Sequence, residues 1–446
     1  MKSVHKEPWI GDIPDEWALK AIKRIVSIKV TDGPHETPEL EDSGVQFISA
    51  EAIKNNRIDF NQRRGFISQE LHEQYCRKCK PQRGDIFVIK SGATTGNVAF
   101  VDVDFEFSIW SPLALIRCNH HLALFKYVFY VLLSDVFRKQ VELSWSFGTQ
   151  QNIGMGVIEC LKIPLPPMPE QQRIAAYLDA SCAAVDAALS AKRRQLETLD
   201  DLRRETITRA ITLGLKPSTR TKASGEDYIG DIPAHWSAPS LKRLLSEPLT
   251  YGLNEAAELE ERDLPRYLRI TDFDDDGTLR DDTFRSLPRE IACEALLKPN
   301  DVLFARSGAT VGKTFMFRNY EGEACFAGYL IRARTLPWKL DPLFLYLFTK
   351  SSAYESWKNL IFTQATIQNI SAAKYNYLSI PLPPLDEQRA IVAHIEKKNT
   401  EFQILMAGMK NQIAALTAYR KSLIHECVTG QRRITEADLN HVKAHG

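Results

Sequence analysis

"IPLPPMPEQQRIAAYLD", residues Ile163–Asp179, returns as "IPLPPLDEQRAIVAHIE" at Ile380–Glu396, at an offset of 217 residues. In both stretches a proline-rich stop is followed by a Glu-Gln pair, whose acidic and amide groups suit a helix N-terminus. Apolar residues then recur at three- and four-residue steps, which is typical of a coiled-coil seam. The first helix is predicted from Pro169 to Leu213, roughly 65 Å at 1.5 Å per residue. The two helices are expected to pack antiparallel and to hold two similar globular parts apart.

Three further pairs of segments repeat in the same order at nearly the same offset. They are "WIGDIPDEW" at Trp9 and "YIGDIPAHW" at Tyr228, "SGATTGNVAF" at Ser91 and "SGATVGKTFM" at Ser307, and "TQQNI" at Thr149 and "TIQNI" at Thr366. The chain is therefore a tandem duplication of a unit of about half its length. Between these anchors each copy mixes short strand-like runs with turns, and the copies share little residue identity.

The composition is that of an ordinary globular protein with several domains. The chain has 446 residues and a formal net charge of +1, so a DNA-binding face would have to be a local patch. Uninterrupted apolar runs such as Leu343–Phe348 are too short to span a bilayer, and the N-terminus shows no secretory signal. The 8 cysteines are scattered and fit a reducing compartment. We expect a cytoplasmic protein without a membrane segment.

The two "IPLPP-x-x-EQ" boxes, the repeated "IGDIP-x-x-W" segments and the "SGAT-x-G" loops together resemble the specificity subunits of type I restriction-modification systems. The resemblance covers essentially the whole chain. It implies an α+β fold in which two mixed α/β target recognition domains are separated by two long antiparallel helices that form a coiled coil. Each domain would read one half of a bipartite target in double-stranded DNA. The helices would set the spacer between the half-sites and dock two methyltransferase subunits.

The same resemblance implies that the chain is a non-catalytic specificity subunit of a methyltransferase and endonuclease complex. Motor-nuclease subunits would join for restriction, and S-adenosylmethionine, ATP and Mg would be cofactors of the partner subunits rather than of this one. The residues agree, because the chain has no Asn/Asp-Pro-Pro-[Phe/Tyr] box and no G-x-G-x-x-G motif after a strand.

The duplication and the resemblance together predict the domain boundaries. They are an N-terminal conserved segment at 1–25, recognition domain 1 at 26–162, a central conserved region with long helix and linker at 163–244, recognition domain 2 at 245–379, a C-terminal conserved helix at 380–430, and a tail at 431–446.

"SGATVGKT", which ends at Thr314, is close to a nucleotide-binding P-loop. A P-loop needs four residues between its two glycines, and here three separate Gly308 from Gly312. The first copy has Asn97 in place of Lys313, so a tight turn between strands accounts better for both copies. An NTPase, and a coiled-coil scaffold that does not read DNA, remain as alternative functions.

Two segments are reminiscent of metal sites, but neither is expected to bind a metal. In Asp272–Thr283 the carboxylates follow the spacing of an EF-hand loop, but the last position is threonine instead of glutamate. An Asx-rich hairpin turn explains this segment better. Cys76 and Cys79 form a lone CxxC, which is a weak signal for zinc, and the second copy has Ala292 and Ala295 near those positions.

The candidates for DNA contact are basic, hydroxyl and amide groups of the two recognition domains, because Arg can read guanine, Asn or Gln can read adenine, and Lys holds phosphate. In the first copy they are Arg63, Arg64, Arg77, Lys78, Lys80, Arg83, Lys90, Thr94, Thr95, Asn97, Gln150, Gln151 and Asn152. In the second copy they are Arg262, Arg266, Arg269, Arg285, Arg289, Arg306, Thr310, Lys313, Gln364, Gln368 and Asn369.

Overall fold

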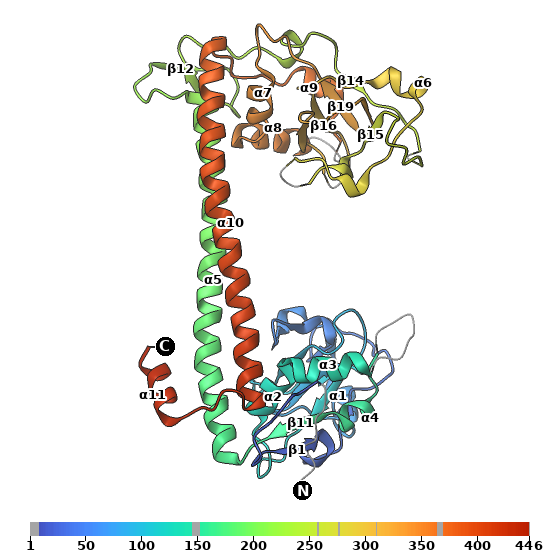
Figure 1. Ribbon diagram of the computed structural model, residues 1–446. Coiled ribbons are helices and arrows are strands. Elements are labelled where there is room, and N and C mark those ends of the chain that lie inside the picture. The colour runs from blue at the N-terminus through green and yellow to red at the C-terminus, as the bar shows by residue number, and fades with distance from the viewer. Residues whose placement is uncertain are drawn as a thin grey trace. The chain divides into compact units, whose positions relative to one another are not determined.

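The computed structural model describes residues 9–144, 152–256, 258–274, 277–308, 310–363 and 369–445 (Figure 1). Contacts divide the chain into two compact units. Unit 1 comprises Met1–Arg193 and Asn411–Gly446, and unit 2 comprises Arg194–Lys410. Each unit therefore contains one copy of the globular part together with one segment from each of the two long helices.

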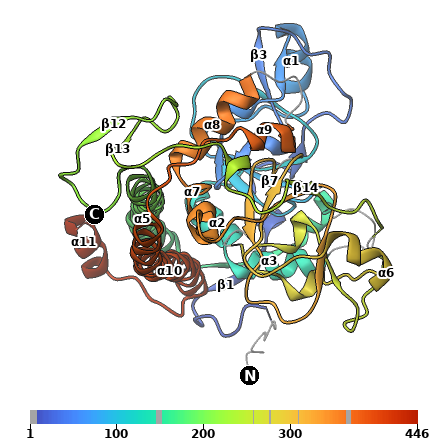
Figure 2. The same cartoon turned by 90° about the horizontal axis from the view of Figure 1, so that it is seen from above.

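The long helices are α5, Met168–Leu213, and α10, Leu385–Thr429, so the predicted first helix is confirmed to within one residue. In unit 1, Ile174 and Leu178 of α5 share a hydrophobic core with Leu423 of α10. In unit 2, the later part of α5 packs against the early part of α10 in the same way. The early part of α5 thus pairs with the late part of α10 in unit 1, and the late part of α5 pairs with the early part of α10 in unit 2. The helix segments therefore pair antiparallel in each unit, as predicted. Figure 2 looks along both helices, which lie side by side.

The globular part of unit 1 is built on a four-stranded antiparallel sheet in the order β2-β10-β7-β8. A second sheet has three strands in the order β6-β3-β9, and β1 pairs with β11. The bounds are β1 Ala18–Ala21, β2 Thr31–Asp32, β3 Val45–Ile48, β6 Gly65–Ile67, β7 Ile86–Ile89, β8 Val98–Phe100, β9 Ser108–Ile109, β10 Leu113–Ile116 and β11 Lys162–Leu165. Two helices, α2 Phe125–Leu133 and α3 Asp135–Leu143, bury their apolar faces in the same core as the long helices.

Unit 2 repeats this plan. Its four-stranded antiparallel sheet has the order β14-β19-β16-β17, which matches β2-β10-β7-β8 strand for strand. The strands are β14 Thr250–Tyr251, β16 Val302–Ala305, β17 Thr314–Met316 and β19 Leu330–Ala333, with β15 Arg266–Leu268 parallel to β18 Ala324–Phe326. Helices α7 Pro342–Phe348 and α8 Ser352–Thr363 take the places of α2 and α3. The duplication is thus a duplication of fold.

The remaining α-helices and strands are short. They are α1 Gln69–Cys76, α4 Met155–Cys160, α6 Arg289–Ala292, α9 Ala372–Asn376, α11 Glu436–His445, β4 Ile53–Lys54, β5 Arg57–Ile58, β12 Thr221–Ala223 and β13 Asp231–Pro233.

The Glu-Gln pair at the start of each long helix fastens that helix to its globular part. The buried Gln171 side chain accepts from the amide of Leu124 at 2.8 Å and donates to two main-chain carbonyls. Gln388 makes the corresponding three bonds in unit 2, accepting from the amide of Asp341 at 2.8 Å. The preceding glutamate of each pair accepts a bond from an indole, at 3.0 Å from Trp17 and at 3.1 Å from the tryptophan of the second copy. This network explains why the boxes and the "IGDIP-x-x-W" segments occur together.

By length and composition alone, α5 could cross a membrane, because an 18-residue window within it has a mean hydropathy of 1.3. The sequence prediction considered uninterrupted apolar runs only. In the structure the apolar residues Ile174, Leu178 and Cys182 of α5 are buried against protein in the core of unit 1. A helix can be as long and as apolar as α5 because its apolar side chains pack into a protein core, without any membrane.

Candidate nucleic-acid interface

A short glycine loop joins two antiparallel strands in each unit, β7 to β8 in unit 1 and β16 to β17 in unit 2. Both glycines of each loop have positive φ, 99° at Gly92 and 88° at Gly96, and 80° at Gly308 and 77° at Gly312. Side chains disfavour this backbone region, so both copies need glycine there. The second loop leads into a strand at Thr314, so no helix N-terminus follows it to hold a phosphate as in a P-loop. The predicted tight turn is confirmed, and the NTPase alternative is not supported.

The candidate side chains of the two loops differ in exposure. Thr94 and Asn97 are exposed in unit 1, whereas the hydroxyl of Thr95 donates to the carbonyl of the loop's first glycine at 2.7 Å. In unit 2, Lys313 is exposed and Thr310 is half-buried. The loops therefore present polar groups to solvent in both units.

The Asn-Ile pair that ends the repeated "TQQNI" and "TIQNI" segments lies beside the glycine loop in both units. Asn152 forms a β-bridge to the first serine of its loop, and Asn369 does the same in unit 2. The amide that follows each asparagine donates to the carbonyl of Lys90 at 2.8 Å and of Arg306 at 2.9 Å. The structure thus brings together two candidate segments that are about sixty residues apart in the chain. Gln150, Gln151, Gln364 and Gln368 lie outside the described residues.

In unit 1 two candidate lysines converge on one buried carboxylate, Asp32. Lys78 Nζ lies 2.6 Å from its Oδ1 and 2.8 Å from the carbonyl of Gly33, and Lys90 Nζ bonds its Oδ2. Burial raises the pKa of Asp32, but the bonds from the two lysines outweigh it, and the net result is a lowered pKa. Asp32 is fully buried and the Lys90 side chain is only 11% exposed. Lys90 therefore has a structural partner, whereas the Lys78 side chain is half exposed.

In unit 2 the position of Lys90 is taken by Arg306, whose partner is an aromatic ring. The Arg306 guanidinium carbon lies 4.7 Å from the ring centre of Tyr251. Tyr251 occupies the strand position of Asp32, because Asp32 pairs with Ala114 in β10 and Tyr251 pairs with Ile331 in β19. A ring holds a cation without neutralising its charge. The two units therefore keep a cation at one site but differ in the net charge around it.

Two further arginines of unit 1 stack on aromatic rings. The Arg63 guanidinium carbon lies 4.4 Å from the ring centre of Phe66, and that of Arg64 lies 4.0 Å from the ring centre of Trp110. Arg64 also forms a loose ion pair with Glu51 at 3.6 Å. These contacts hold the guanidinium planes. Arg63 also donates to the carbonyl of Phe60 at 3.1 Å, and the other N–H groups of the two arginines suit the reading of bases or phosphates.

The rest of the basic stretch of unit 1 is exposed. Lys80 pairs with Glu106, and Arg83 pairs with Asp104. Arg77 at the end of α1 forms no ion pair or hydrogen bond through its side chain within the described part of the chain. Exposed pairs are weak, so these cations can exchange an acid side chain for a phosphate at little cost.

The arginines of unit 2 are mostly bound to its own loops. Arg262 forms a two-pronged pair with Asp281, at 2.9 Å for each bond. Arg269 holds the buried Asp272 at 2.8 Å. Arg266 is 3% exposed and donates to a main-chain carbonyl. Arg266 and Arg269 thus stabilise the recognition domain itself.

Arg285 and Arg289 complete the set in unit 2. The half-buried Arg285 lies 2.7 Å from the exposed Glu260, and Arg289 lies 2.5 Å from Glu323 in an exposed pair. DNA contact by any of the candidates in the two units stays a prediction, and the exposed ones fit it better than the buried ones.

The two segments that were weighed as metal sites show other roles. Asp274 accepts from the amide of Thr278 at 2.8 Å and Phe273 forms an antiparallel bridge to Leu279, as expected for a hairpin, while Asp276 lies outside the described residues. Burial raises the pKa of the Cys79 thiol to about 12, and Cys76 ends α1 beside a histidine. Within the described ranges no group of three or more His, Cys, Asp or Glu side chains could hold a metal ion.

The partners of these cations were missed by sequence reasoning. Asp32, Trp110 and Tyr251 lie 58, 46 and 55 residues from the cations that they hold. A single sequence offers no signal for such pairs, because strand pairing brings them together and no local spacing reveals them.

A family model described as "Type I restriction modification DNA specificity domain" matches residues 14–198 and 291–415. Among relatives, the type I restriction enzyme EcoBI specificity subunit of Escherichia coli is 23% identical over 347 residues, 74% of this chain and 72% of that protein. The StySPI specificity subunit of Salmonella potsdam is 22% identical over 94% of this chain and 90% of its own length.

The fold also resembles a solved structure described as "Structural basis underlying complex assembly and conformational transition of the type I R-M system". The match has a TM-score of 0.71 and 19% identity, and covers 94% of this chain and 98% of that one. At this identity the likeness is one of fold.

Proposed function

The chain belongs to the type I restriction-modification DNA specificity family, and from this premise we propose that it selects the bipartite DNA target of a methyltransferase and nuclease complex. The observation that carries the proposal is that the family model matches both copies of the duplication. DNA sequence specificity is thus the role of the chain, and the copies supply two recognition modules.

Each unit would read one half-site. Support comes from two framework sheets with the same strand order but different side chains at equivalent positions, such as Asp32 and Tyr251. Since base readout depends on side-chain donors and acceptors at the groove, equal frames with unequal side chains suit two different half-sites. Exposed, stacked cations such as Arg64 are the favoured contacts to bases or phosphates.

The long helices would set the spacer between the half-sites and dock two methyltransferase subunits. We assign no catalysis to this chain, and place S-adenosylmethionine, ATP and Mg on the methyltransferase and motor-nuclease partners. The complex would encounter its DNA in the cytoplasm. Helices α5 and α10, of 46 and 45 residues, support the spacer role because their lengths are nearly equal.

The test is to express the chain with its methyltransferase partner and to map modified bases across a genome. We expect modification at a motif of two specified half-sites separated by an unspecified spacer. Absence of modification at any bipartite motif, with the complex assembled, would contradict the proposal.

A second test inserts about one helical turn, roughly four residues, into both α5 and α10. The spacer of the modified motif should change while the half-sites stay the same. Changed half-sites at an unchanged spacer would contradict the role of the helices.

A further inference from the structure

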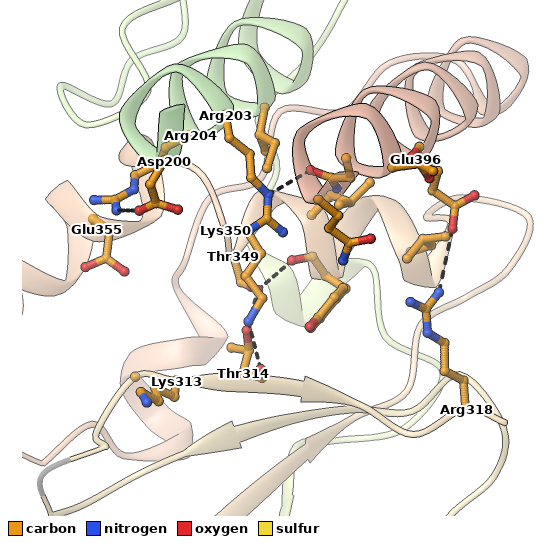
Figure 3. Close-up of a pocket in the computed structure, with 18 of the residues that line it drawn as sticks. Asp200, Arg203, Arg204, Lys313, Thr314, Arg318, Thr349, Lys350, Glu355 and Glu396 are labelled. Carbon is orange, nitrogen blue, oxygen red and sulfur yellow. Dashed lines mark hydrogen bonds and ion pairs between the residues drawn. The ribbon is translucent and has the colours of Figure 1, made fainter. Parts of the chain in front are cut away.

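Unit 2 contains a cavity of about 630 Å³ where α5, α10, α7, α8 and β17 meet (Figure 3). Its wall is rich in cations, contributed by Arg203, Arg204, Lys313, Arg318, Lys350 and Lys358. Asp200, Glu355 and Glu396 are the acids that line it. The cavity wall therefore holds twice as many cations as acids.

Three of the cations are matched by the three acids. Arg204 lies 2.6 Å from Asp200, and Lys358 lies 2.8 Å from Glu355. Arg318 lies 3.6 Å from a glutamate of α10. These pairs account for all the acids that line the cavity.

Arg203 and Lys350 bond only to neutral oxygens among the described residues. Arg203 Nε donates to the side-chain carbonyl of Asn399 at 3.0 Å. Lys350 Nζ donates to the main-chain carbonyl of Thr314 at 2.9 Å and lies 4.6 Å from the ring centre of Tyr346. Figure 3 shows Arg203 reaching from α5 toward Lys350. In the described part of the chain, two positive charges thus lie close together without a carboxylate bonded to either of them.

The pKa of Lys350 is shifted by this environment. The pKa of Lys350 is lowered to about 8, mainly by burial and further by the positive charges of Arg203, Lys313 and Lys358, while Glu355 acts in the opposite direction. Gathering cations in a partly desolvated cavity is unfavourable unless an anion joins them.

The first copy shows that the fold does not require these cations. The two copies align here at an offset of 217, since the buried Ser134 and Ser351 make the same bond to the carbonyl three residues earlier. At the positions of Lys350 and Lys358 the first copy has Leu133 and Val141, and at the position of Lys313, where the glycine loops align at an offset of 216, it has Asn97. These three residues line a smaller cavity of about 220 Å³ in unit 1.

Arg203 has a counterpart in unit 1, Arg420 of α10. Arg420 lies 2.9 Å from Asp186, whereas the position of Asp186 is Gln403 in the second copy. Unit 2 therefore has the arginine, lacks its acid and adds lysines around it.

We propose that the cavity of unit 2 binds a phosphate-bearing anion, with Arg203 and Lys350 as its principal partners. Guanidinium and ammonium groups together suit phosphate oxygens, the first by paired donors and the second as a point charge. Uncharged Asn399, Thr400 and Gln403 line the same wall and can add neutral hydrogen bonds. The source of the phosphate is a free oligophosphate or the backbone of DNA.

The experiment titrates the purified full-length chain with inorganic triphosphate by calorimetry at low and moderate salt. We expect saturable binding of one triphosphate that weakens at least tenfold in Lys350→Met and in Arg203→Gln. Lys350→Arg, which keeps the charge, should retain binding. The matched control is Arg420→Gln in unit 1, which should bind triphosphate as the unaltered chain does.

A second arm distinguishes the two sources with a DNA duplex. A DNA backbone source predicts that triphosphate competes with the duplex and that Lys350→Met weakens duplex binding. A free oligophosphate source predicts unchanged duplex binding in the same variant.

The proposal is overturned if triphosphate does not saturate, or if Arg420→Gln weakens binding as much as the two cavity variants. Thermal unfolding of each variant establishes that it is folded before it is scored. Because the probe is inorganic triphosphate, failure here leaves the reading of half-sites untouched.

Discussion

The two units share a frame and differ in the charges placed on it. The frame is the sheet order, the buried glutamine at the start of each long helix and the indole bond to the glutamate beside it. The differences are Asp32 against Tyr251 beneath the glycine loop, and Leu133 against Lys350 in the cavity next to α3 or α8. Backbone-directed bonds maintain the fold, so side chains that face loops and cavities are free to diverge.

The largest test of this comparison replaces residues 245–379 by residues 26–162. The shared glutamine and tryptophan bonds should accept either recognition domain, so the complex should still assemble. We expect the modified motif to contain the first half-site twice, as mapped by sequencing of modified bases. Persistence of the original second half-site would show that the recognition domain does not determine it.

Replacing Asp32 by Asn tests the charge beneath the loop of unit 1. It leaves the nearly buried Lys90 without its acid, so we expect a loss of about 3 kcal/mol in the free energy of unfolding of unit 1 at pH 7. The folded pKa of Asp32 lies below its ordinary 3.8, so its contribution is complete above that pH and is lost as the pH falls further. Urea unfolding as a function of pH, with hydrogen exchange to localise it, is the measurement.

The control for this variant is Tyr251→Phe at the equivalent position of unit 2. It keeps the ring beneath Arg306 and introduces no acid, so the acid limb of the unfolding curve should not change. An acid limb that is unaltered by Asp32→Asn would mean that Asp32 does not hold Lys90 in solution.

The frame could be predicted from the sequence because it is recorded in local patterns. The duplication, both long helices and the strand–turn–strand around Gly92 and Gly308 follow from repeats, periodicity and glycine placement. The pairing of Trp17 with Glu170 could not be predicted, since 153 residues separate them. The motifs that contain these two residues were recognised, but their contact was not.

The charges on the frame were only partly predictable. A basic stretch shows where cations are, but not which of them are neutralised, so the buried Arg266 and the exposed Arg77 were equal candidates. Of the cavity cations, Arg203 lies on α5 and Lys350 lies in the turn between α7 and α8, and neither belongs to a motif. They come together only because α5 passes α7 and α8 in the folded unit.

Gln171→Ala and Gln388→Ala form a matched pair that tests the frame. Each removes three hydrogen bonds and leaves an amide and two carbonyls unsatisfied, so each should cost about 1–3 kcal/mol in the free energy of unfolding of its own unit. Hydrogen exchange resolved by unit would measure both. Costs that differ by more than about 2 kcal/mol would mean that the two helix starts are not equivalent.

The smallest expected effect comes from Lys350→Met, and its sign is opposite to that of the others. A lysine whose pKa falls to about 8 on folding disfavours the folded state at neutral pH, and this penalty disappears as the pH rises from 8 toward the ordinary 10.5. Without phosphate, the variant should therefore gain about 1–2 kcal/mol at pH 7 and lose the rise in stability above pH 8. Leu133→Met in unit 1, which changes no charge, is the control. A stability that falls in Lys350→Met at pH 7 would show that Lys350 already has its anion within the chain, and the contrast between the two cavities would vanish.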